Sequence, residues 1–167
     1  YVCGKDCIDF ADLEEKLGNP LTSMMILCNP HNPTGNIWNR DILDKIGKLC
    51  KKYHVLVVSD EIHCDITKPG IIYIPFASVS DVCRDNCITC VAPTKTFNIA
   101  GIQTAAVIVA DENIRHRVVT GLEQDHLAEP NGFAADAVAP AHSEGGEWPV
   151  DLREDPWANT HFAERLL

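Results

Sequence analysis

Four short apolar runs restrict the folds that this 167-residue chain can adopt. A helical pattern lies between the first run, Met24–Cys28, and the second, Val55–Ser59; the third and fourth are Cys87–Val91 and Ala105–Ala110. A strand, a helix and a strand in this order favour a right-handed crossover between parallel strands. The sequence therefore predicts an α/β fold with a mostly parallel sheet and flanking helices. The uninterrupted apolar character of Met24–Cys28 predicts a strand buried on both faces.

Capping residues mark where two helices begin. Asp9 is a suitable N-cap for a short helix that Gly18 and the following Asn-Pro would end. Asn39 is a suitable N-cap for a second helix that reaches Tyr53, with lysines near its negative C-terminal end. Both helices carry apolar residues at helical spacing, so each is expected to pack one stripe against the sheet.

Polar residues follow the apolar runs directly. Asn32 lies in the turn after the first run, Asp60 and His63 follow the second, and Thr94 and Lys95 follow the third. Ligands of such sheets bind at the carboxyl ends of parallel strands. An amide, a carboxylate, an imidazole and an amine are therefore expected to meet at one edge of the sheet.

Lys95 is the only charged residue between Asn86 and Ala110. Burial there would lower the pKa of its amine, and a partly neutral amine is what a Schiff base with an aldehyde cofactor requires. The alternative is a lysine of a surface loop whose charged end reaches water past apolar neighbours. The residues around Lys95 leave both interpretations open.

Asp60 ends a strand that is predicted to be buried. An unpaired charge at such a place would be costly, so the carboxylate is expected to have a cationic or hydrogen-bonded partner. Its alternative role is the N-cap of a short helix over residues 61–65. The nearby turn NPHNPTG, taken by itself, is equally compatible with a rigid loop.

Charge limits the classes of partner. The chain carries 14 Lys and Arg against 24 Asp and Glu, a formal net charge of −10, which opposes binding to phosphate backbones and to anionic membrane surfaces. No window approaches the ~18 apolar residues of a spanning helix. Residues 1–20 lack the basic, apolar and small-residue order of a signal peptide. We expect a cytoplasmic protein without nucleic acid or membrane as partner.

Eight cysteines raise the possibility of disulfides or zinc. Cys3 and Cys7 are four residues apart, and Cys83, Cys87 and Cys90 form a second group. Structural zinc favours pairs of ligands in loops, whereas Cys87 and Cys90 lie in an apolar run. We therefore expect reduced, structural cysteines and no metal site.

Three segments together resemble one enzyme family. CNPHNPTGNIW, VVSDEIHCDI with the later IPFAS, and APTKTFNIAGIQ are similar to consecutive signatures of the fold-type I pyridoxal-phosphate enzymes of the class I/II aminotransferase family. The resemblance extends over nearly the whole chain. The DEIH segment resembles the cystathionine β-lyase-like carbon–sulfur lyases, since most aminotransferases have a tyrosine at the place of this histidine.

The resemblance implies pyridoxal 5′-phosphate as cofactor and gives roles to five residues. Lys95 matches the lysine that binds the cofactor covalently and then moves the substrate's Cα proton. Thr94 would offer its hydroxyl to the cofactor phosphate, and Asp60 would pair with the pyridine nitrogen and keep it protonated. Asn32 would donate a hydrogen bond to the phenolic oxygen, and His63 stands where relatives often place a tyrosine near that oxygen.

The activity implied by the resemblance is β-elimination from a sulfur-containing amino acid, which yields a thiol, pyruvate and ammonia. An aminotransferase would use every residue named above, and only DEIH favours the lyase. A third hypothesis is a noncatalytic, truncated interaction module. Family members are typically dimers with shared active sites, so a homodimer is expected for the full-length parent.

The resemblance also implies that the chain is a central fragment of the large domain. A glycine-rich turn that holds the phosphate, an aromatic residue that stacks on the ring and an arginine that binds the substrate carboxylate would lie outside it. Gln103 stands where many relatives have a phosphate-binding arginine. The fragment alone is therefore expected to have little or no turnover.

Two regions are expected along the chain. Residues 1–130 would be the central part of the cofactor-binding large domain, and residues 131–167 an irregular or helical segment leading toward a missing small domain. Because proline within a helix costs ~3 kcal/mol, the prolines at 140, 149 and 156 predict that any long helix in this second region is broken or kinked.

Overall fold

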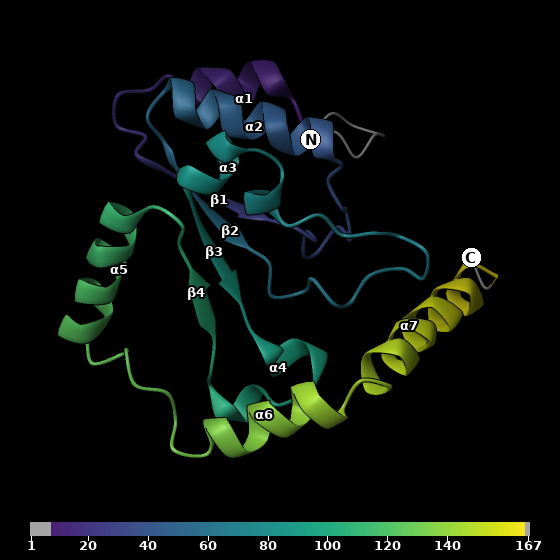
Figure 1. Ribbon diagram of the computed structural model, residues 1–167. Helices are drawn as coiled ribbons and strands as arrows, with labels where there is room; N and C mark the ends of the chain where they lie inside the picture. The colour runs from purple at the N-terminus through teal and green to yellow at the C-terminus, as the bar shows by residue number, and fades with distance from the viewer. Residues whose placement is uncertain (1–7, 166–167) are drawn as a thin grey trace.

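The computed structural model describes residues 8–165 and contains one four-stranded sheet. Strands β1, β2 and β3 are parallel neighbours in that order, and β4 pairs antiparallel with β3 (Figure 1). The predicted α/β fold with a mostly parallel sheet is confirmed. The second strand lies one residue later than its apolar run indicates, and the fourth is shorter. The strands are β1 (Met24–Cys28), β2 (Leu56–Asp60), β3 (Cys87–Val91) and β4 (Ala106–Ile108).

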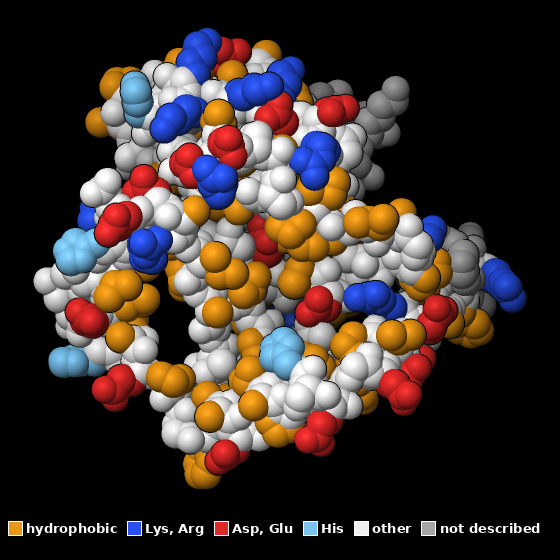
Figure 2. Space-filling view, viewed as in Figure 1, with side chains coloured by type: hydrophobic (Ala, Val, Ile, Leu, Met, Phe, Trp, Pro, Cys, Tyr) orange, Lys and Arg blue, Asp and Glu red, His pale blue; other side chains and the backbone are white. Residues whose placement is uncertain are grey.

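Three helices form a layer over one face of the sheet: α1 (Phe10–Leu17), α2 (Arg40–Lys52) and α3 (Asp81–Asp85) (Figure 1). The Asp9 side chain accepts hydrogen bonds from the first turn of α1, and the Asn39 side chain accepts one from the Ile42 N–H at 3.0 Å. Both predicted N-caps are therefore confirmed. Lys and Arg side chains gather over this helical layer, at the top of the view in Figure 2.

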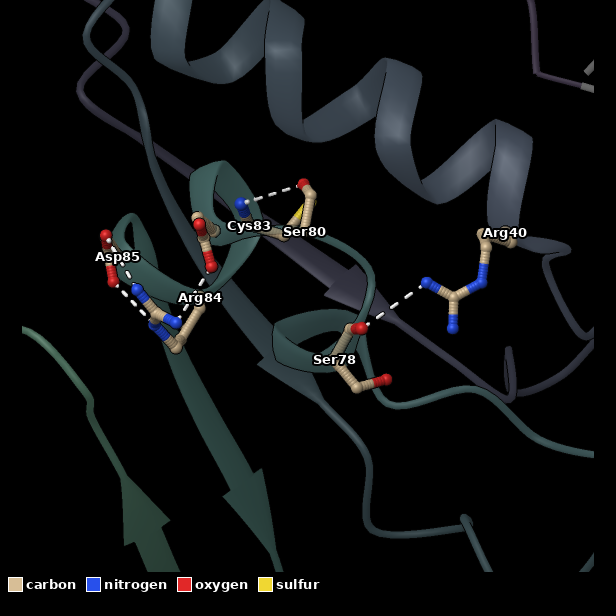
Figure 3. Close-up of polar contacts among 7 residues, drawn as sticks. Arg40, Ser78, Ser80, Cys83, Arg84 and Asp85 are labelled. Atoms are coloured by element: carbon tan, nitrogen blue, oxygen red, sulfur yellow. Dashed lines mark hydrogen bonds and ion pairs between the residues drawn. The ribbon is translucent and has the colours of Figure 1, made fainter.

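Polar contacts join α2 to the short helices that follow β2 (Figure 3). Arg40, at the start of α2, donates to the carbonyl oxygens of Ser78 and Val79, next to the 3₁₀ helix η1 (Phe76–Ser78). The Ser80 hydroxyl accepts from the Cys83 N–H and so caps α3, in which Arg84 pairs with two aspartates. These contacts hold the chain between β2 and β3 against the helical layer.

The hydrophobic core lies between this layer and the sheet. Leu43 and Ile46 of α2 meet Val57 of β2 and Phe76 of η1, and all four side chains are fully buried. Burying one such side chain contributes roughly 1.5–3 kcal/mol. The core therefore fixes β1 and β2 below α2, and with them the strand ends at which the polar residues lie.

The other face of the sheet is largely uncovered by the described residues. Ile26 and Met24 of β1 are 69% and 52% exposed. Leu27 of the same strand belongs to the core cluster and is buried. The prediction that Met24–Cys28 is buried on both faces is wrong for this chain. An apolar run shows that both faces of a strand are apolar, but the residues that could cover the second face are not among those described.

Close packing at Gly47 predicts a destabilising substitution. A Cβ at this buried position of α2 would overlap the Cys83 sulfur and lie 3.5 Å from the Phe76 ring. Gly47→Ala is expected to lower the free energy of unfolding by about 1–3 kcal/mol, because the overpacking exceeds the gain in helix propensity. Urea denaturation measures this change. As a control, Gly121→Ala in α5 (Glu112–Gln124), where nothing lies within 4 Å, should leave stability unchanged or raise it; equal effects at both positions would contradict the packing argument.

The C-terminal region is helical through two of its prolines. Pro140 lies inside α6 (Ala134–Glu144), and Pro156 lies inside α7 (Trp148–Glu164). The chain breaks instead between the two helices, where Gly145 caps α6. Pro149 falls in the first turn of α7, where a missing N–H costs no helical hydrogen bond. The region therefore forms two helices and no single long one, as predicted, but the break lies at residues 145–147 and not at a proline.

The remaining short helices lie beyond β3: α4 (Pro93–Thr96) and the 3₁₀ helix η2 (Ala100–Ile102). Helix α6 packs against this part of the chain, since the rings of Phe97 and His142 meet edge to face with centroids 5.2 Å apart. No helix within residues 8–165 is long and apolar enough to cross a membrane.

The six described cysteines are free thiols. Burial raises the pKa of Cys50 and of Cys87 to about 11, so both stay neutral at physiological pH. No group of three or more potential metal ligands occurs within the described part of the chain. Cys3 and Cys7 lie outside the described residues, so the prediction made for them stays open.

Candidate functional site

The five residues expected at the site all lie at or directly beyond the carboxyl ends of parallel strands. Asp60 is the last residue of β2, and its register partners are Cys28 of β1 and Cys90 of β3. Lys95 lies on α4, which begins two residues after β3. The carboxylate and the amine therefore come from neighbouring strands at the same edge of the sheet (Figure 1).

Asp60 is half-buried and hydrogen-bonded. Its Oδ1 accepts from the Ile62 N–H at 3.3 Å, and its Oδ2 lies 3.9 Å from the Cys28 sulfur. This confirms the prediction of a hydrogen-bonded partner. Residues 62–65 form a turn and no helix, so the alternative role of Asp60 as a helix N-cap is wrong. Burial and the Asp60 charge raise the pKa of the Cys28 thiol, which keeps it a neutral donor to the carboxylate.

Lys95 is exposed, and its amine has no hydrogen-bond or ion-pair partner within residues 8–165. Of the two interpretations, the structure supports the surface position and contradicts the buried one. Thr94, its neighbour in α4, is half-buried.

The two asparagines of the NPHNPTG turn occupy different environments. Asn29 is fully buried: its side chain donates to the Ile74 carbonyl at 3.2 Å and accepts from the Trp38 N–H at 3.1 Å. Asn32 is exposed. The first asparagine holds the loop to the body of the protein, which leaves the second available to a ligand.

A cavity of about 590 Å³ lies between this turn, the segment after β2 and α7. Asn32 and His63 line it, whereas Asp60, Thr94 and Lys95 do not. The structure thus brings two of the five expected residues into one cavity. The other three lie at the same sheet edge outside it.

Sequence reasoning missed Thr96, which is 1% exposed and joins three segments. Its hydroxyl donates to the Asp65 carboxylate at 2.9 Å, and its carbonyl accepts from the Trp148 indole N–H at 2.7 Å. Arg153 of α7 in turn donates to the Asp65 carbonyl at 2.7 Å. These contacts fix α4, and therefore the backbone of Lys95, to the DEIH segment and to α7. They join residues 31 to 88 positions apart, so no local pattern could indicate them.

Glu61 is a second residue that sequence reasoning missed. It is 2% exposed, and its carboxyl group accepts from the Ser59 hydroxyl at 2.7 Å, the Phe76 N–H at 3.0 Å and the Tyr73 hydroxyl. These contacts join the end of β2 to residues 73–76. Glu61 therefore fixes both ends of the segment that carries His63. Its place directly after Asp60 is the only signal that the sequence offers.

Burial raises the pKa of Glu61 above its ordinary value of 4.5, although two of its hydrogen bonds act in the opposite direction. The folded protein therefore binds this proton more tightly than the unfolded chain does. It follows that the contribution of Glu61 to stability is greatest below pH ~4.5 and is lost as the pH rises through the folded-state pKa. Unfolding free energies of the wild type and Glu61→Gln, measured from pH 4 to 8, should show the wild type losing stability relative to the variant. A difference that is constant with pH would contradict this.

The donor set at the sheet edge fits pyridoxal phosphate chemically. A carboxylate suits a protonated ring nitrogen, an amine suits an aldehyde, and amide, imidazole and hydroxyl groups suit the phenolic and phosphate oxygens. The structure places all of these groups after the ends of three neighbouring parallel strands.

Residues 5–138 match the family described as Aminotransferase class I and II. The chain belongs to this family. It is 46% identical to the cystathionine beta-lyase PatB of Bacillus subtilis over 164 residues. This alignment covers 98% of this chain and 42% of that protein. The resemblance to the class I/II aminotransferase family is therefore confirmed, and relatives from its carbon–sulfur lyase branch are among the similar proteins.

Solved structures give the same result. The PLP-bound C-S lyase from Staphylococcus hominis superposes with a TM-score of 0.86 at 32% identity, over 96% of this chain and 40% of that one. Cystalysin from Treponema denticola, whose structure contains a pyridoxal 5′-phosphate cofactor, superposes with a TM-score of 0.82 at 32% identity, over 90% and 39%. The fold matches part of these fold-type I structures, and the chain spans about two fifths of the length of these relatives.

Proposed function

We propose that the protein to which this chain belongs is a pyridoxal-phosphate-dependent carbon–sulfur β-lyase. The observation that carries the proposal is the 46% identity to a cystathionine beta-lyase over 98% of the chain. The placement of Asp60 and Lys95 at one sheet edge supports it. The proposed substrate is a sulfur-containing amino acid, and the proposed products are a thiol, pyruvate and ammonia.

Pyridoxal phosphate, when bound, supplies an aldehyde that joins to amines and a ring that withdraws electrons from the substrate's Cα. Lys95 would hold the aldehyde carbon and, once displaced by substrate, remove the proton from Cα. Asp60 would keep the proton on the ring nitrogen, with its carboxylate oriented by the Ile62 N–H and the Cys28 thiol. Asn32 and His63 would bind the phenolic oxygen, and the Thr94 hydroxyl the phosphate.

An assay on the whole protein separates the lyase from its nearest alternative, an aminotransferase. With pyridoxal phosphate and cystathionine, the lyase releases pyruvate without any added keto acid. An aminotransferase forms its product only when a keto acid is supplied. Dependence on a keto acid would therefore replace the proposed reaction by amino-group transfer.

A noncatalytic interaction module is the second candidate, because the chain spans only about two fifths of its relatives and residues 111–167 carry twelve acids against four bases. Size-exclusion chromatography of the isolated chain, alone and with a full-length subunit, tests it. A stable complex would favour the module. A monomer that binds no subunit would remove it.

For the whole protein we propose a cytoplasmic homodimer.

A further inference from the structure

The cavity beside α7 has a cationic and aromatic wall in addition to the expected cofactor residues. Lys68, from the segment after β2, and Arg153 and Trp157, from α7, form this wall, and Asn32 and His63 line the same cavity. Among the described residues that line the cavity there is no Asp or Glu. This is unusual in a chain whose net charge is −10. The cavity opens to solvent beside α7, where Figure 2 shows the molecule hollowed.

Neutral groups hold both cations in place. The Lys68 amine lies 4.1 Å from the centroid of the Trp157 ring, within the range of a cation–π contact. The Arg153 Nε donates to the Asp65 main-chain carbonyl, and its two terminal nitrogens make no hydrogen bond to any described residue. Neither cation forms an ion pair within residues 8–165, whereas Lys16, Lys48, Lys52 and Arg84 each pair with a carboxylate.

Two positioned cations without a carboxylate partner favour an anionic ligand, and the exposed ends of an arginine bind a carboxylate in a bidentate way. The cavity volume of about 590 Å³ falls within the range of ~300–1,000 Å³ that small-molecule sites occupy.

We propose that Lys68 and Arg153 form a subsite for a carboxylate at the far end of the substrate's sulfur-bearing side chain. This inference rests on the proposed lyase function, because Asn32 and His63 of the same cavity would bind the cofactor on which the substrate reacts. The subsite makes the enzyme selective for thioether amino acids with an anionic tail over those with a neutral tail.

Binding of small probes to the 167-residue chain tests the wall without any turnover. Glutarate should shift the Trp157 indole N–H resonance in a saturable way, and neutral glutaramide should not; Trp157→Phe identifies the resonance. Lys68→Met and Arg153→Met should each weaken glutarate binding roughly tenfold. Lys51→Met, an exposed lysine of α2 away from the cavity, is the matched control and should leave binding unchanged. Equal shifts with glutarate and glutaramide, or full binding in both variants, would overturn the proposal.

Turnover by the whole protein then separates this inference from the proposed function. For an S-(carboxyalkyl)cysteine, Lys68→Met should lower kcat/KM about tenfold, while kcat/KM for the corresponding amide stays unchanged. Arg153→Met also removes the donor to the Asp65 carbonyl, so it should lower kcat/KM for both compounds, and by a larger factor for the acid. Equal turnover of acid and amide by wild type and variants would overturn the subsite and leave the lyase standing. Turnover of neither compound, nor of cystathionine, would overturn the lyase and the substrate assignment together.

Discussion

Lys95→Ala is expected to abolish β-elimination in the whole protein, with a loss of roughly 10²–10⁴-fold or more in kcat. The same change should remove the visible absorbance that the wild type acquires with pyridoxal phosphate. The physical reason is that Lys95 is the only amine of α4, and both the covalent bond to the cofactor and the removal of the Cα proton require an amine at this position. Pyruvate release from cystathionine and an absorbance spectrum measure the two effects.

The matched control is Lys51→Ala, which removes an exposed lysine on α2. It should leave both the spectrum and the rate unchanged. Because Lys95 is exposed and makes no side-chain hydrogen bond or ion pair within the described residues, its replacement should not lower stability. An active Lys95→Ala protein with an unchanged spectrum would remove Lys95 from the proposed mechanism.

Glu61→Ala is expected to lower the free energy of unfolding by about 2–4 kcal/mol. The substitution leaves the Ser59 hydroxyl and the Phe76 N–H without their acceptor in the buried interior, and it also removes the contact with Tyr73. Urea denaturation of the isolated chain measures the loss. Since Glu61 joins β2 to residues 73–76, amide exchange in the segment between them should also become faster.

Glu61→Gln and Tyr73→Phe are the graded controls. Glutamine keeps an acceptor for Ser59 and Phe76, and phenylalanine removes only one of the three donors, so each should cost about 1 kcal/mol. A loss in Glu61→Ala no larger than in Tyr73→Phe would show that the three contacts do not act together, and would contradict the proposed role of Glu61.

The fold followed from the sequence wherever local chemistry determines structure. Asp9 and Asn39 cap the helices that they were expected to cap, because a short polar side chain satisfies the first free N–H groups in any context. The exposure of Ile26 could not be predicted, since it depends on what covers the sheet. Pro140 and Pro156 lie within helices despite the local cost of an interior proline. Contacts of His142, Trp148 and Arg153 join these helices to segments distant in sequence, and no local pattern indicates such contacts.

For the candidate site, the sequence predicted the location of the residues but not the contacts that hold them in place. That Asp60 and Lys95 lie at one sheet edge followed from the positions of the strand ends. The contacts that hold them did not, because Thr96, Asp65 and Arg153 are distant in sequence and meet only in the folded chain. The roles of the five residues expected at the cofactor remain predictions.

Covalent trapping tests most directly whether Lys95 and Asp60 hold pyridoxal phosphate at this edge of the sheet. The whole protein is incubated with the cofactor and reduced with borohydride, and the labelled lysine is identified by mass spectrometry of peptides. We predict a single label on Lys95, and a lower yield of that label in Asp60→Ala. A label on Lys68 in the cavity, or label spread over the lysines of α2, would contradict the proposed site.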